Sequence, residues 1–228
     1  MHVVVTGANR GIGLGLVRHL LEAGHTVTAT ARAPEKATEL AALDPGDDRL
    51  RIGQLDVTSP DSLCDFAAFV GDATVDVLIH NAGILLTGGD LGAFDYGAFA
   101  TSFEVNSVGP LRVVEALLPA MKRSDDKRVM LMTSKMGSIS DCGSGRAYAY
   151  RMSKTALNMA TKCLACELGD DGFTVVCAHP GWVQTDMGGP NALIDVDTSV
   201  SGLLSVIEGL TAEDNGAFVE WNGNRIPW

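Results

Sequence analysis

Two side chains near the middle of the chain have the types and the spacing of an acid–base pair. Tyr150 and Lys154 stand four residues apart, which places them on one face of a helix. A tyrosine hydroxyl ordinarily has a pKa of about 10, too high for easy proton exchange at neutral pH. A neighbouring lysine ammonium stabilises the phenolate and lowers that pKa. The pair is therefore a candidate general acid–base, although so short a pattern is weak evidence by itself.

A glycine-rich segment near the start of the chain gives the pair its context. The β-branched run over 2–6 predicts a buried strand, and leucines at helical spacing predict a helix over 12–23. Between them, glycines at positions 7, 11 and 13 allow the backbone to approach a pyrophosphate. The N-terminus of the helix adds N–H groups and a partial positive charge. We therefore predict a dinucleotide site that includes Gly7, Asn9, Arg10, Gly11, Ile12 and Gly13.

Four further motifs follow along the chain. They are His80-Asn81-Ala82-Gly83, Asn106-Ser107-Val108-Gly109, Thr133-Ser134 after an apolar strand, and Pro180-Gly181-x-x-x-Thr185. In this order they resemble the motifs of the short-chain dehydrogenase/reductase family, with His80 in place of the first asparagine. The resemblance covers nearly all 228 residues. A closer resemblance, to the C-factor and sniffer-type branch, rests on the segments 135–139, 150–159, 179–187 and 226–228.

The family resemblance implies a catalytic tetrad of Asn106, Ser134, Tyr150 and Lys154. It implies hydride transfer from a nicotinamide to a substrate carbonyl, with Tyr150 giving a proton to the oxygen and Ser134 hydrogen-bonding the same oxygen. Lys154 would lower the pKa of the tyrosine and hold the nicotinamide ribose, and Asn106 would anchor a water that connects Lys154 to solvent. Further cofactor contacts are implied for Asn81, Ala82, Gly83, Pro180, Gly181, Val183 and Thr185, together with Tyr150 and Lys154.

The second predicted strand indicates which nicotinamide cofactor to expect. An NAD site usually has an acid at the end of this strand, whereas here the strand ends in Ala31-Arg32. Arg32 can bind a 2′-phosphate with its planar fork, and Arg10 can reach it from the other side. We therefore predict NADPH, with NAD(H) as the weaker alternative. Asp56 and Val57, after the third strand, are expected near the adenine, although Asp56 can also serve in a turn.

Predicted strands and helices alternate along the chain. We expect strands at 2–6, 26–31, 50–55, 74–79, 128–133, 173–178 and 217–221, and helices at 12–23, 34–43, 60–70, 95–104, 107–123, 148–169 and 197–209. This alternation predicts an α/β fold with a parallel sheet and helices on both faces. With the resemblance, it is a Rossmann-type, doubly wound, single domain over residues 1–228. The motifs all follow strands, so they should share one edge of the sheet.

Composition restricts the partners. The net charge of −11 argues against nucleic acid and anionic membrane surfaces. The longest stretch without a charged side chain, Gly172 to Thr185, is too short to span a membrane. We expect no signal peptide and a cytoplasmic protein. Cys163 and Cys166 have no partners for a zinc site, so we predict no metal and expect both in the core or an interface.

The substrate and the assembly are less well determined. Ser134 and Tyr150 are sixteen residues apart, about three more than the family usually shows, and Ser138 is a competitor for the serine role. An apolar substrate pocket could be lined by Leu85, Leu86, Met136, Trp182 and Met187, although such residues are as often core. By the resemblance, the helices at 107–123 and 148–169 would pair subunits into a homodimer or homotetramer. Three functions remain open: a carbonyl reductase acting on a small molecule, a C-factor-like signalling protein, and a nucleotide sensor, the last disfavoured by the intact tetrad.

Overall fold

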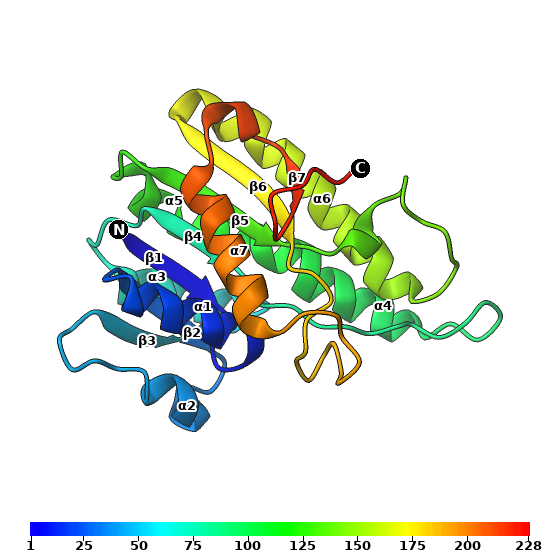
Figure 1. The fold of residues 1–228 in the computed structure, drawn as a ribbon, viewed down its shortest axis with the longest axis horizontal. Coiled ribbons are helices and arrows are strands. Elements are labelled where there is room, and N and C mark those ends of the chain that lie inside the picture. The colour runs from blue at the N-terminus through cyan, green and yellow to red at the C-terminus, as the bar shows by residue number, and fades with distance from the viewer.

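The strands of the chain form one parallel sheet with helices on both faces (Figure 1). The computed structural model describes residues 1–228. Each neighbouring pair of strands is parallel, and their order is β3-β2-β1-β4-β5-β6-β7. The predicted α/β fold with a doubly wound sheet is confirmed. The strands are β1 (His2–Thr6), β2 (Thr26–Ala31), β3 (Leu50–Gln54), β4 (Val77–His80), β5 (Lys127–Met132), β6 (Phe173–His179) and β7 (Phe218–Glu220).

Two apolar layers hold the helices against the sheet. Helices α1 (Gly11–Glu22) and α7 (Val196–Gly209) cover one face, and α3 (Pro60–Val70), α5 (Gly109–Lys122) and α6 (Tyr148–Leu168) cover the other (Figure 1). Strand β1 serves both layers because its side chains alternate: Val3 and Val5 pack on the first side and Val4 on the second. Burial on both faces explains why the central strands β1 and β4 are largely β-branched and apolar.

The direction in which the sheet grows reverses between β1 and β4. The chain first adds β2 and β3 on one side of β1, and then returns to add β4 through β7 on the other. Connections that leave β1 and β4 therefore diverge to opposite faces, which opens a crevice at the carboxyl ends of these strands. Thr6 and His80 are neighbours at that end in the register of the two strands.

The helix expected at 34–43 is wrong. A 3₁₀ turn, η1 (Pro34–Lys36), and a four-residue helix, α2 (Thr38–Ala41), occupy that segment, separated by Ala37 with non-helical dihedral angles. Only Ala37 and Leu40 are buried there. The segment has too few buried apolar side chains to form a continuous apolar face. A longer helix there would therefore not be held against the sheet.

The two helices expected at 95–104 and 107–123 are joined by a π-helical segment. Helix α4 (Tyr96–Phe103) runs into η2 (Glu104–Val108), which leads into α5. Wide turns of this kind occur frequently at functional sites, and this one carries Asn106. A smaller difference concerns the start of β4, which begins at Val77 rather than at residue 74. None of the helices combines the length and apolar character that a membrane-spanning segment needs.

Candidate active site

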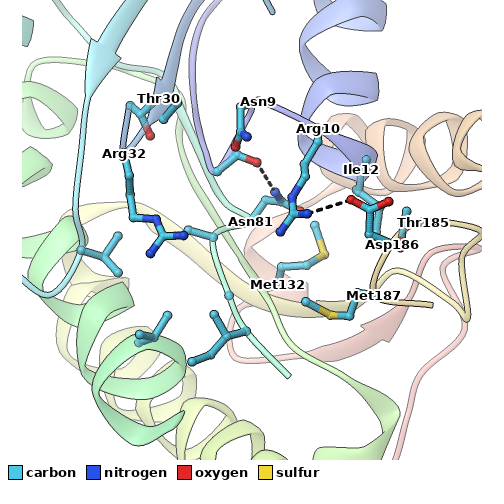
Figure 2. Close-up of a pocket in the computed structure, with 18 of the residues that line it drawn as sticks. Asn9, Arg10, Ile12, Thr30, Arg32, Asn81, Met132, Thr185, Asp186 and Met187 are labelled. Atoms are coloured by element: carbon cyan, nitrogen blue, oxygen red, sulfur yellow. Dashed lines mark hydrogen bonds and ion pairs between the residues drawn. The ribbon is translucent and has the colours of Figure 1, made fainter. Parts of the chain in front are cut away.

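The carboxyl ends of the strands open into one cleft of about 990 Å³ (Figure 2). The cleft brings together residues predicted from motifs that lie far apart in the chain. Its lining includes Gly7, Asn9, Arg10, Gly11, Ile12, Arg32, Asp56, Val57, Asn81, Ala82, Gly83, Tyr150, Lys154, Pro180 and Thr185. Five predicted residues lie outside the lining: Gly13, Asn106, Ser134, Gly181 and Val183. The sequence did not single out Thr30, Glu39, Met132, Gln184 and Asp186, which also line the cleft.

The glycine turn between β1 and α1 is shaped by close backbone contacts. Gly7 and Gly11 have positive φ angles of 63° and 54°, which favour glycine. A Cβ atom on Gly13 would lie 2.3 Å from the carbonyl oxygen of Gly7, so Gly13 shapes the turn from beneath without reaching the cleft. Helix α1 has no side-chain cap and no acid in its first turn. Its first N–H groups are therefore free of side-chain acceptors, as an anion-binding turn requires.

Asn81 fixes the same turn from the neighbouring strand. Its Nδ2 donates to the carbonyl oxygens of Thr6 at 3.2 Å and Gly7 at 2.9 Å. The backbone N–H of Ala82 donates to Thr6 Oγ1 at 3.1 Å. These bonds tie the loop after β4 to the loop after β1, so the two sides of the crevice keep a constant separation. The glycine cradle fits a pyrophosphate group because its backbone is both close-packed and rigidly held.

The part of the cleft beside the ends of β2 and β3 has an arginine without an ion-pair partner. Arg32 lines the cleft and forms no ion pair. Asp56 Oδ1 accepts hydrogen bonds from the hydroxyl of Thr58 at 2.7 Å and from its N–H at 2.9 Å. These bonds, with a smaller contribution from Arg32, hold the pKa of Asp56 below its usual value. Asp56 thus has the turn role that the sequence analysis gave as its alternative, and it also lines the cleft.

Arg10 differs from the expectation. Its guanidinium forms an ion pair with Asp186 at 2.7 Å, whereas Arg32 lies apart from this pair, beside Thr30 (Figure 2). The two arginines therefore do not converge on one point. The side chains of Arg10 and Asp186 are 68% and 79% exposed, so the pair is weak and the guanidinium is readily released. Asp186 follows the predicted Thr185, and its proximity to Arg10 depends on folding alone.

Tyr150 and Lys154 are both buried on α6 and both line the cleft. Lys154 Nζ donates to the carbonyl oxygen of Met132 at 2.8 Å and lies 5.9 Å from the centre of the Tyr150 ring. Burial raises the pKa of Tyr150, and a hydrogen bond with Ser134 opposes that rise. Burial also lowers the pKa of Lys154 to about 8. The expected lowering of the tyrosine pKa by Lys154 is thus not seen here, because desolvation is the larger effect on both groups.

Asn106 is fully buried beside these residues. Its Oδ1 accepts from the N–H of Ile84 at 2.9 Å, and its Nδ2 donates to the carbonyl of Ile84 at 2.9 Å and to Ser153 Oγ at 3.0 Å. A Cβ atom on Gly83 would lie 3.2 Å from Asn106 Oδ1 and 3.4 Å from Lys154 Nζ. The two polar groups thus flank the same glycine, and the amide keeps one acceptor position for a further donor.

Ser138 has a different task from the serine beside Tyr150. Its hydroxyl donates to the carbonyl of Pro227 at 2.6 Å and accepts from the N–H of Asp141 at 3.1 Å. The residue is only 2% exposed, so its hydroxyl is directed into the protein. Ser134 is the second residue after the end of β5, and its Oγ accepts from the N–H of Met136 at 3.2 Å. Of the two serines, Ser134 is therefore the one that lies beside the Tyr150 hydroxyl, although it is buried and does not line the cleft.

The apolar lining differs from the set expected from the sequence. Met187 lines the cleft, whereas Leu85, Leu86, Met136 and Trp182 do not. Met132, the last residue of β5, takes part instead, and Figure 2 shows it with Met187 in the cleft. The sequence signal for Met132 was its place one residue before Thr133-Ser134, at the carboxyl end of a strand. Two flexible thioether side chains here form an adaptable apolar surface.

The cysteines and His80 lie outside the site. Cys163 and Cys166 are exposed on α6, so the expectation of a core position is wrong and an interface position stays a prediction. The protein contains no cluster of side chains that could hold a metal ion. His80 is 1% exposed, and burial lowers its pKa to about 3, so its ring is neutral. It does not line the cleft.

Comparison with known proteins identifies the family. The family model described as short chain dehydrogenase matches residues 1–192. The chain therefore belongs to the short-chain dehydrogenase family, as the motifs indicated.

Individual relatives point to the branch that the sequence resembles. The C-signal protein of Myxococcus xanthus is 48% identical over 163 residues, which are 72% of this chain and 98% of that protein. The structure of the carbonyl reductase Sniffer of D. melanogaster is 33% identical, has a TM-score of 0.95, and the match covers 100% of this chain and 99% of that one. The NADPH-bound carbonyl reductase from chicken fatty liver is 37% identical, with a TM-score of 0.94 and coverage of 100% and 94%.

Proposed function

We propose that the protein is an NADPH-dependent reductase that converts a small-molecule carbonyl to an alcohol. The observation that carries the proposal is the meeting, at one sheet edge, of the glycine cradle, the unpaired Arg32 and the Tyr150–Lys154 pair. The Sniffer protein and the chicken enzyme, which are carbonyl reductases by name, support the reaction class. When bound, the reduced nicotinamide supplies a hydride.

The protein's own residues would bind and orient the reactants and move the proton. Gly7, Gly11 and the start of α1 hold the pyrophosphate, and Arg32 meets the 2′-phosphate with its planar fork. Further cofactor contacts come from Asp56, Val57, Asn81–Gly83, Pro180 and Thr185. No acid stands at the end of β2 to favour an NAD ribose diol. Arg10 reaches the same phosphate only after it releases Asp186.

Tyr150 acts as the general acid in this proposal. Its hydroxyl gives a proton to the carbonyl oxygen as negative charge develops there, and the Ser134 hydroxyl hydrogen-bonds the same oxygen. Burial raises the pKa of Tyr150, which keeps its hydroxyl protonated but also weakens it as an acid, and the hydrogen bond with Ser134 opposes that rise. Lys154 holds the ribose once its bond to the Met132 carbonyl is exchanged, and Asn106 anchors a water that returns the proton.

The assembly is proposed on the basis of the exposed side chains of α5 and α6. Leu111 on α5 and Met152 and Met159 on α6 are large apolar residues that are 37%, 47% and 65% exposed. Cys163 and Cys166 continue that surface of α6. A second copy would cover them, which gives a homodimer or homotetramer. Sedimentation of the protein, with Met159→Lys as the disrupting variant, tests this assignment.

A panel of aldehydes, ketones and diketones tests the reaction. We expect loss of the reduced-nicotinamide absorbance with NADPH on at least one carbonyl and slower or no loss with NADH. Tyr150→Phe should abolish the turnover while NADPH still binds. Binding of NADPH without turnover on any carbonyl contradicts the reductase proposal.

A second candidate is a signalling role with little or no turnover, favoured by the 48% identity to the C-signal protein. The test is a strain that lacks this protein and shows a developmental or behavioural defect. If Tyr150→Phe restores the wild-type behaviour, the role does not depend on proton transfer. If it fails while its NADPH affinity is intact, the reductase activity is the function.

A further inference from the structure

Arg151, which follows Tyr150 directly, makes an unusual set of contacts for a charged residue. Its Nε donates to the carbonyl of Arg146 at 2.9 Å, one terminal nitrogen to the carbonyl of Met136 at 3.3 Å, and the other to Ser144 Oγ at 3.1 Å. It forms no ion pair with any carboxylate. All three nitrogens of the guanidinium are therefore used on neutral oxygen atoms of two loop segments.

Those two segments lead to the two groups that must act on one substrate oxygen. Met136 belongs to the 3₁₀ turn η3 (Lys135–Gly137) that follows Ser134, and its N–H donates to Ser134 Oγ at 3.2 Å. Ser144 and Arg146 belong to the loop that leads into α6, where Tyr150 stands. The Ser134 hydroxyl is thus connected to Tyr150 in three steps. The N–H of Met136 donates to Ser134 Oγ, the carbonyl of Met136 accepts from Arg151, and Arg151 is joined to Tyr150 by a peptide bond.

The loop before α6 needs such an external support. Ala147 adopts a left-handed conformation with φ of 53°, which costs free energy for a residue other than glycine. Helix α6 also begins without a side-chain cap. The backbone N–H of Arg151 donates to the Ala147 carbonyl at 2.9 Å, and its Nε holds the preceding carbonyl at Arg146. Arg151 therefore stabilises the strained turn from which Tyr150 is presented.

Ser134 and Tyr150 are sixteen positions apart, and the segment that connects them includes an exposed loop. Residues 141–146 are exposed and contain two glycines, so the segment itself has few buried contacts to determine its shape. The planar fork of an arginine can satisfy three separated acceptors at once, whereas a lysine ammonium is a single point charge. The geometry of the contacts thus matters more than the charge.

We propose that Arg151 is a positioning residue that sets the Ser134 hydroxyl at its working distance from the Tyr150 hydroxyl by clamping the 136 and 144–146 segments together. It does not touch the reactants. The proposal rests on the proposed reductase function, because both hydroxyls are assigned to the carbonyl oxygen there. Its role is to maintain an alignment, and small misplacements of aligned groups lower rates strongly.

The test compares three variants: Arg151→Met, Arg151→Lys and the matched control Arg146→Met. Arg146 is exposed and its side chain makes no hydrogen bond, so its variant removes a charge of the same sign from the adjoining loop and keeps the backbone carbonyl that Arg151 binds. We expect Arg151→Met to lower kcat about 10- to 100-fold, with NADPH affinity within about twofold of the wild type. Arg151→Lys should behave like Arg151→Met, and Arg146→Met like the wild type.

Several outcomes overturn the proposal. Wild-type kcat in Arg151→Met, or in Arg151→Lys, contradicts it, because either result shows that the planar fork is not needed. Equal losses in Arg151→Met and Arg146→Met assign the effect to charge. Parallel losses of NADPH affinity and kcat assign it to general unfolding of the site.

A second measurement separates this proposal from the reductase function. If the wild type reduces no carbonyl, the proposed function fails, and amide hydrogen exchange in the segment 136–147 then decides the role of Arg151. Faster exchange there in NADPH-bound Arg151→Met than in Arg146→Met supports the clamp. Equal exchange in the two variants contradicts it.

Discussion

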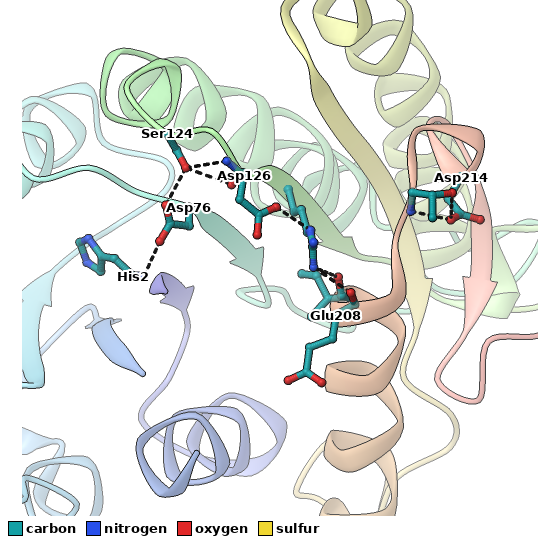
Figure 3. Close-up of polar contacts among 9 residues, drawn as sticks. His2, Asp76, Ser124, Asp126, Glu208 and Asp214 are labelled. Carbon is teal, nitrogen blue, oxygen red and sulfur yellow. Dashed lines mark hydrogen bonds and ion pairs between the residues drawn. The ribbon is translucent and has the colours of Figure 1, made fainter. Parts of the chain in front are cut away.

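The two ends of the sheet use polar side chains in opposite ways. At the amino end, Asp76 accepts from the His2 N–H at 2.7 Å and from Ser124 Oγ at 2.6 Å, and the same hydroxyl accepts from the Asp126 N–H at 3.0 Å (Figure 3). Arg128 pairs with Asp126 and donates to two carbonyls at the end of α7. These groups bind one another, so they stabilise the fold and are unavailable to a ligand.

Several groups at the carboxyl end are instead unpaired, strained or desolvated. Arg32 has no carboxylate partner, Ala147 has a left-handed backbone, and Lys154 is buried with a pKa lowered to about 8. Such features cost stability and persist where a binding partner is expected. The difference indicates that the amino end determines stability and the carboxyl end determines function. Four substitutions or conditions test that division.

Replacing Tyr150 with phenylalanine should have the largest effect on activity and almost none on stability. Loss of a positioned general acid lowers rates by about 10²- to 10⁴-fold. The ring stays in place, so the unfolding midpoint and the NADPH affinity should not change. Steady-state kinetics and calorimetry measure the two quantities. Tyr148→Phe, whose ring packs on Phe94 at 5.0 Å, is the control. A similar loss in both variants argues against a specific acid.

Replacing Asp76 with alanine should lower stability and leave activity unchanged. Two donors at the amino end, His2 N–H and Ser124 Oγ, lose a charged acceptor. We expect the free energy of unfolding to fall by about 2–3 kcal/mol, while kcat/KM at a temperature where the variant is folded stays unchanged. Urea denaturation gives the first value. The control is Asp72→Ala at an exposed position of the preceding loop. A parallel loss of kcat/KM in Asp76→Ala would contradict the division of roles between the two ends of the sheet.

Acid should weaken the fold through a buried histidine near the carboxyl end. Burial lowers the pKa of His80 to about 3 from its ordinary value of 6.5, so the unfolded chain binds the proton and the folded chain does not. Stability is therefore complete above about pH 6.5 and falls as the pH is lowered toward 3, by about 1.4 kcal/mol per pH unit for this residue. Urea denaturation at pH 7, 6 and 5 of the wild type and His80→Asn measures the slope. Equal slopes would contradict this account.

Replacing Arg32 with alanine should have the smallest of these effects. The variant loses the charged fork proposed for the 2′-phosphate, so NADPH affinity should fall about tenfold and NADH affinity should stay the same. Arg10→Ala should change NADPH affinity less, because Arg10 is already paired with Asp186. Fluorescence titration with both nucleotides measures the affinities. A larger effect at Arg10 would mean that the pair with Asp186 opens when the nucleotide binds.

Much of the fold could be predicted because it depends on local patterns. Continuous β-branched runs and helical apolar spacing predicted all seven strands and most helices, and the order of motifs predicted their common edge. The helix at 34–43 was wrong because its sequence permits a helix while its few buried side chains do not support one. The π-helical turn at Asn106 was not predicted by the apolar spacing, and the bonds of its amide to Ile84 join it to a loop that is distant in the chain.

The sequence by itself determined the family, the sheet and the identities of the candidate site residues, because motif spacing and periodicity are properties of neighbouring residues. Only the tertiary structure decided which polar groups are free and which are occupied. Arg10 meets Asp186 across 176 positions, and Ser138 meets Pro227 across 89. The raised pKa of Tyr150 depends in the same way on burial by distant segments. Charge state, pairing and desolvation follow from distances in space, which the order of residues does not specify.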